Sequence, residues 1–234
     1  MAAAFYNFHP AMVARAVPGC WDTVAPLTLC RVRAIAASEA LGEACSATAR
    51  SNLVAALPLL RRACAGCVGA GRVMAAANLG LWPAIGTALG TGGMAEAWQA
   101  CTTLREHRGD GHVAALVAHG AGGIDANLLA VGTKAVPPEL LRDNRGWSEE
   151  EWERASTGLA ARGLLHVDGR ATDAGRTLHA SIEEQTDRLA AAPFAGLGDA
   201  ALADLHGALV ACAREIVASG VLPFPNPMGL PPVA

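Results

Sequence analysis

The sequence predicts a mainly α-helical protein, with a helical bundle followed by a group of short helices and one small two-stranded β-hairpin. Three observations support this fold class. Apolar side chains between residues 10 and 73 recur at helical spacing with few strand signals. From Asp110 onward the helical segments become shorter. Residues 163–172 have the pattern of two strands around a turn at Asp168-Gly169.

The first half of the chain is expected to be helical. Helices are predicted over residues 10–17, 27–41, 44–67 and 94–107, with a break at Pro18-Gly19. The uncharged run 73–95 is long enough to span a bilayer on length alone, but it contains Pro83 and five glycines. We therefore interpret this run as a buried, broken segment of a soluble protein.

Capping residues place the elements of the second half. The helix over 94–107 is expected to end at Gly109, and Asp110 is expected to cap a new helix over 111–120. Ser148 and Glu151 have the spacing of a capping box. Further helices are predicted over 124–132, after Pro137-Pro138, from 148 to about 162, and from 173 through 189.

These elements divide the chain into three parts. Residues 1–108 are predicted to form a helical domain, and residues 109–192 a domain of short helices with the hairpin. Residues 193–234 are predicted to contain a C-terminal helix and a proline-rich, extended tail.

Helices, a hairpin and a final helix in this order form the layout of a winged helix-turn-helix. Residues 147–189, with the stretches WSEEEW, RGLL and TDAGR, resemble the winged-helix domain of MarR-type regulators. The whole chain is similar to a family of actinobacterial proteins with a MarR-like helix-turn-helix. The shared motifs are FYNFHP..VARAVP..W at 5–21, LREHRGDGHVAAL at 104–116 and PFPNPMGLP at 223–231. The resemblance implies that family members carry a further segment before the first motif.

Charge argues against DNA as the main partner. The chain has a net charge of −3 and a pI of about 6.1, whereas DNA-binding domains usually present a basic face. The predicted recognition helix carries four glutamates against Arg154 and Arg162, and carboxylates there are repelled by phosphates. The glutamates are Glu149, Glu150, Glu151 and Glu153.

The stretch LREHRGDGH, residues 104–112, contains six ionisable side chains. A helix terminus explains several of them, because cations are stabilised near the C-terminal end of a helix. It does not explain Glu106 together with His112, and a histidine beside a carboxylate can act as general acid or base. We therefore assign candidate catalytic roles to Glu106, His107, Asp110 and His112, and candidate ligand-binding roles to Arg105 and Arg108.

The motif YNFHP is the second candidate region. Tyr6, Asn7 and His9 lie immediately before a helix that Pro10 can start, and they form either a wall of a ligand pocket or an inter-helix staple. We assign them candidate ligand-binding roles and leave both interpretations open. A metal site of His107, His112, Asp110 and His9 is not predicted, because its spacing is not a recognised one.

The seven cysteines do not predict a disulfide framework, because their number is odd and they are scattered through predicted helices. The pair Cys64-Ala-Gly-Cys67 is interpreted as two small residues of an alanine-rich helix, since no second pair completes a zinc site.

The function that these features favour is binding of a small anionic or carbonyl-bearing molecule in an inter-domain pocket, with its chemical transformation left open. The alternative is a MarR-like regulator that reads DNA and senses a ligand. No cofactor is identified, no membrane partner is expected, and a homodimer is left open. A cytoplasmic location is expected, because the chain opens without the pattern of a targeting signal.

Overall fold

The computed structural model describes residues 4–86, 93–133, 136–230 and 232–233, and its regular elements there are all helices. The chain separates into two compact units. The first consists of Met1–Thr23, His112–Arg188 and Pro225–Pro231, and the second of Val24–Gly111, Leu189–Phe224 and Pro232–Ala234. Each unit is therefore assembled from segments that are distant in the sequence.

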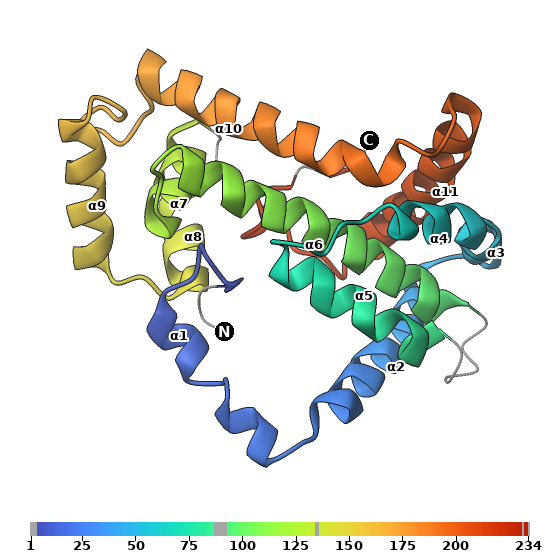
Figure 1. The fold of residues 1–234 in the computed structure, drawn as a ribbon. Coiled ribbons are helices and arrows are strands. Elements are labelled where there is room, and N and C mark those ends of the chain that lie inside the picture. Colours follow the sequence, from blue (N-terminus) through green and yellow to red (C-terminus); the bar gives the residue numbers. More distant parts are fainter. Residues whose placement is uncertain (1–3, 87–92, 134–135, 231, 234) are drawn as a thin grey trace. The chain divides into compact units, whose positions relative to one another are not determined.

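The second unit is a helical bundle. It contains α2 (Pro26–Ala44), α3 (Ala47–Ala55), α4 (Leu57–Ala65), α5 (Val73–Gly86), the first part of α6 (Met94–Ala118), η3 (Ala192–Phe194) and α11 (Asp199–Ala218). α11 packs against α3 and α4 (Figure 1). Leu53, Leu60 and Leu205 belong to the buried apolar core of this unit, together with small alanine side chains that let the helices approach closely.

The first unit contains the short helices. Its elements are α1 (Pro10–Ala14), η2 (Gly19–Asp22), the end of α6, α7 (Gly123–Thr133), α8 (Pro138–Arg145), α9 (Glu149–Ala161) and most of α10 (Asp173–Ala191). Leu129, Trp152 and Leu159 form the centre of its core, joining α7 to α9. The helix predicted over 124–132 is confirmed by α7.

The predicted two-stranded β-wing is wrong. The described residues contain no strand, and residues 163–172 form a single isolated bridge between Leu165 and Ala171. The returning arm is short because Thr172 already starts α10. Its hydroxyl donates to the carbonyl of Gly163 over 2.6 Å and accepts the backbone N–H of Gly175 over 3.1 Å. Backbone that caps a helix cannot extend a strand ladder.

The predicted helix break at Gly109 is also wrong, because α6 continues through Gly109 and Gly111 to Ala118. Glycine in a helix costs only about 1 kcal/mol relative to alanine, which the surrounding packing can offset. At Gly111 the packing leaves no room for a side chain. A Cβ atom there would lie 2.9 Å from Nη1 of Arg72 and 3.2 Å from Cβ of Leu189.

The long uncharged run is partly described. Residues 73–86 form α5, whereas residues 87–92 lie outside the described residues. Over the described chain, no single helix is long and apolar enough to cross a membrane, although α6 and α7 taken as a pair, bent by 97°, pass the same test of length and composition.

Candidate functional site

The turn between α8 and α9 is built by two local signals. α8 ends at Gly146, whose φ of 76° lies in the left-handed region that glycine adopts without strain. α9 begins with the predicted capping box, which is confirmed: Ser148 Oγ accepts the N–H of Glu151, and the Glu151 carboxylate accepts the N–H of Ser148. Trp147 lies between Gly146 and Ser148 and is half-buried.

The N-terminal motif closes over this turn. The carbonyl of Asn7 accepts hydrogen bonds from Nε1 of Trp147 (3.1 Å) and from Nδ2 of Asn127 (2.9 Å). The hydroxyl of Tyr6 donates to the carbonyl of Ala121 over 2.7 Å. Tyr6 therefore bonds to the segment between α6 and α7, and Asn7 bonds to α7 and to the α8–α9 turn. These bonds hold the N-terminal motif in place.

The proline-rich tail reaches the same turn through Arg145. Its guanidinium lies 4.2 Å from the centre of the Phe8 ring and donates to the carbonyl of Pro227 over 3.2 Å. The carbonyl of Arg145 accepts the N–H of His9 over 2.8 Å. The N-terminal and C-terminal motifs singled out in the sequence thus meet at one arginine.

His9 has a defined tautomer. Its Nδ1 accepts the backbone N–H of Ala11 over 3.1 Å, so Nδ1 carries no proton, and Nε2 donates to Oε1 of Glu151 over 3.0 Å. The imidazole also packs edge-on against Trp147, with ring centres 5.0 Å apart. Bonds from Ser148, followed by the nearby His9, lower the pKa of the Glu151 carboxyl.

A groove of about 710 Å³ opens beside these groups. Its lining comes from α1 and from the start of α9: His9, Ala11, Met12, Arg15, Gly146, Trp147, Ser148, Glu150, Glu151 and Arg154. Arg154 is paired with Glu150 over 2.7 Å, and Glu151 is bonded to His9. Arg15 is exposed and has no carboxylate partner within the described ranges. The groove therefore combines an aromatic wall with one arginine that forms no ion pair within the described ranges.

The residues of this unit carry a net negative charge. Glu149 and Glu150 at the start of α9 are 77% and 85% exposed. Arg170 is paired with Asp168, and Arg176 with Asp173. The residues of the unit carry 13 acidic against 9 basic side chains, a net charge of −4 with neutral histidines.

Comparison with known families found a match for the chain. A model described as a helix-turn-helix family matches residues 1–223. The chain belongs to this helix-turn-helix family. Comparison with curated proteins found no match, and comparison with solved structures found none either. Family membership applies to nearly the whole chain, so both compact units are part of what defines this helix-turn-helix protein.

The other predicted site residues of the helix-turn-helix protein lie on α6 and are divided between the units. Arg105, Glu106, His107, Arg108 and Asp110 belong to the helical bundle, whereas His112 belongs to the unit of α7–α9. Arg105 forms an ion pair with Glu106, and His112 contacts Thr186 through Nδ1 at 3.0 Å. Of all predicted site residues, His9 is the one that lines the described groove.

His107 and Asp110 extend a buried polar stripe on α6. The stripe also contains Glu96, Gln99 and Thr103. Gln99 donates to the amide oxygen of Asn78 on α5 over 3.0 Å. Asp110 accepts the N–H of Ala75, in the first turn of α5, over 2.8 Å. Asp110 therefore caps α5, not the helix that follows it in the sequence.

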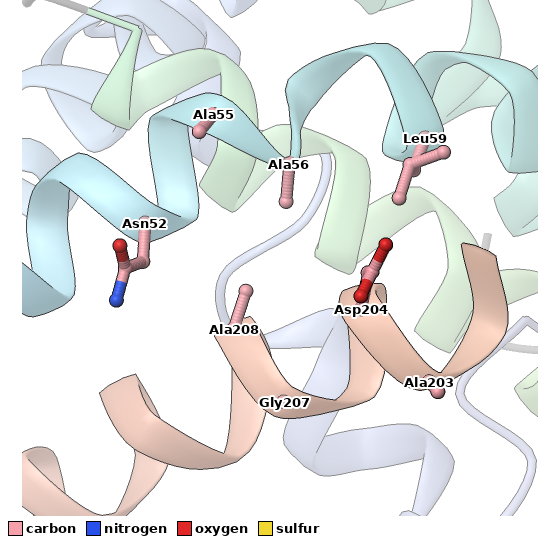
Figure 2. Close-up of a pocket in the computed structure, with 8 residues that line it drawn as sticks. All are labelled: Asn52, Ala55, Ala56, Leu59, Ala203, Asp204, Gly207 and Ala208. Atoms are coloured by element: carbon pink, nitrogen blue, oxygen red, sulfur yellow. The ribbon is translucent and has the colours of Figure 1, made fainter. Parts of the chain in front are cut away.

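No group of three histidine, cysteine, aspartate or glutamate side chains could hold a metal ion in the part of the chain that the structure describes. A second cavity, of about 440 Å³, lies between α11 and the α3–α4 corner (Figure 2). Its walls are mostly alanine and glycine, with Asn52 and Asp204 as exposed polar groups. Such a lining offers few groups that could orient a ligand.

Sequence reasoning missed most of the groove. Arg15, Trp147 and Arg154 line it but were not among the predicted ligand-binding residues. Trp147 carried no specific signal, because an apolar residue directly before a helix N-cap commonly packs against the core, as Trp147 also does. Arg15 had none, because a single arginine on a short helix does not reveal which distant segment it faces.

Proposed function

We propose that this helix-turn-helix protein binds a small anionic molecule in the groove between α1 and the α8–α9 turn. The groove has a volume typical of small-molecule sites. Arg15 supplies a guanidinium for a carboxylate or phosphate group, and Trp147 supplies an aromatic face for an apolar part. The observation that carries the proposal is that Arg15, beside this wall, forms no ion pair within the described ranges.

The state of His9 favours binding over catalysis in this groove. Both ring nitrogens are engaged, Nδ1 as an acceptor and Nε2 as a donor, so no free lone pair is available to take a proton from a ligand. The catalytic roles of Glu106, His107, Asp110 and His112 stay predictions, as do ligand binding by Arg105 and Arg108, the MarR-like character, the homodimer and the cytoplasmic location.

DNA binding is the second candidate function, and family membership favours it. In a helix-turn-helix, the second helix enters the major groove with its N-terminal residues against the bases. Here those residues are exposed glutamates of a unit with a net charge of −4. Because phosphates repel such a face, we place DNA second.

The groove is tested by calorimetric titration of the full chain with benzoate, phenyl phosphate and neutral benzamide. We expect the two anions to bind, and benzamide to bind about tenfold more weakly, because one charge-assisted contact contributes roughly 1.5 kcal/mol or more. The variant Arg15→Ala should lose about the same factor for the anions.

The matched control is Arg188→Ala, an exposed arginine of the same unit that is paired with Glu184 and does not line the groove. Circular dichroism shows whether each variant keeps its helices. Equal binding of benzoate by the Arg15→Ala variant and the unmodified chain would contradict the proposal, as would the absence of binding by every compound in the series.

A further inference from the structure

Two cysteines far apart in the sequence lie side by side in the bundle. Cys45 follows the last residue of α2, Cys212 lies on α11, and their Sγ atoms are 3.1 Å apart. Both residues are buried. A disulfide would bring the sulfurs to about 2.05 Å, so the two side chains need to move by only about 1 Å to become bonded.

Hydrogen bonds next to Cys45 and Cys212 hold these two residues side by side. Ser46, directly after Cys45, donates from Oγ to Oε1 of Glu215 over 2.8 Å, and its backbone N–H donates to the other oxygen of the same carboxylate. Glu215 lies on α11, less than one turn beyond Cys212. Arg50 donates to the carbonyl of Cys45 over 2.6 Å. The corner between α2 and α3 is therefore fastened to α11 directly beside the cysteine pair, and Arg50 holds the backbone of the corner itself.

Cys64 and Cys67, which lie close together in the sequence, do not form such a pair. The thiol of Cys64 contacts the carbonyl of Ala100 at 3.7 Å, and that of Cys67 contacts the carbonyl of Ala63 at 3.9 Å. These two sulfurs point to backbone groups of different helices.

We propose that Cys45 and Cys212 are a redox modification site that forms one intramolecular disulfide with a low-molecular-weight disulfide as oxidant. One cysteine thiolate attacks the small disulfide, forming a mixed disulfide and releasing one small thiol. The second cysteine attacks the protein sulfur of that mixed disulfide, which closes the Cys45–Cys212 bond and releases the second small thiol. Two protein thiols are oxidised and one small disulfide is reduced to two thiols.

Burial makes the reaction slow and condition-dependent. Burial and the adjacent Cys45 raise the pKa of the Cys212 thiol, so little thiolate is present while the corner is closed. A dissolved disulfide reaches the sulfurs when the α2–α3 corner separates transiently from α11. The product cross-links residues 167 positions apart, which restricts the unfolded chain strongly.

The experiment equilibrates the full chain in buffers with increasing ratios of oxidised to reduced glutathione, followed by alkylation, proteolysis and mass spectrometry. We expect a linked peptide pair containing Cys45 and Cys212, loss of two of the seven free thiols, and a rise in Tm of about 5–10 °C. Reduction should reverse all three changes.

Cys45→Ser should remove the linked pair and the rise in Tm. The matched control Cys64→Ser, at another buried cysteine of the same core, should keep both. If either variant fails to fold, the peptide map of the unmodified chain decides alone. A map in which Cys45 and Cys212 stay reduced at every glutathione ratio, or in which either is linked to a different cysteine, overturns the proposal.

Discussion

His107 is the most strongly enclosed titratable side chain of the stretch LREHRGDGH. It is 1% exposed, and neither ring nitrogen has a hydrogen-bond partner within the described chain. Burial lowers the pKa of its imidazole, and the nearby guanidinium of Arg72 lowers it further, while Asp110 acts in the opposite direction. The folded bundle therefore favours neutral His107.

The pH dependence follows from this preference. In the unfolded chain His107 gains a proton as the pH falls through about 6.5, whereas the folded state resists protonation until a lower pH. We therefore expect the free energy of unfolding to decrease between pH 7.5 and 5.5, measured by urea denaturation. His107→Leu should flatten this dependence, and His206→Leu, an exposed histidine of the same unit, should leave it unchanged. An equal pH slope in the His107→Leu variant and the unmodified chain would refute the assignment.

Among the elements, α6 shows what a sequence does and does not reveal. The capping box of α9 was predicted because its signal lies within four consecutive residues. Gly109 and Asp110 have the same local signature of a helix end and a helix start, yet the helix continues. Close packing against Arg72 requires glycine at position 111, and the carboxylate of Asp110 caps α5. Both causes lie on segments that local spacing cannot connect.

The cap on α5 predicts a stability difference. Asp110→Ala should reduce the free energy of unfolding by about 1 kcal/mol, because the N–H of Ala75 loses its acceptor. Asp110→Asn keeps an acceptor oxygen and should recover most of the loss. Chemical denaturation compares the two variants with Asp204→Ala, an exposed aspartate of the same unit. If all three variants unfold alike, Asp110 contributes no cap.

For the whole molecule, the spacing of apolar residues predicted the helical class and composition predicted the acidic character, because both signals are summed over many residues. The β-wing failed although the start of α10 was predicted correctly, because Thr172, the end of the predicted returning strand, caps α10 and leaves only one bridge. The groove could not be predicted, because Arg15 and Trp147 lie far apart in the sequence and come together only in the folded structure.

The net negative charge of the unit that contains α7–α9 makes a prediction for DNA. At physiological salt we expect no sequence-specific binding to the DNA upstream of its own gene, measured by fluorescence anisotropy. Replacing Glu149 and Glu150 with glutamine should strengthen weak binding at low salt, because it removes two exposed negative charges. Nanomolar, salt-sensitive binding to one sequence by the unmodified chain would reverse the order of the two candidate functions.

The contacts of Arg145 also constrain when the protein can fold during synthesis. Arg145 contacts Phe8 and His9, which are translated before it, and Pro227, which is translated after it. Both compact units are interrupted in the same way, since each needs residues translated before and after parts of the other. Domains usually fold one after another as they emerge. Here early helices expose apolar faces until the segments that pack on them are translated, so we expect the nascent chain to be prone to aggregation in that interval.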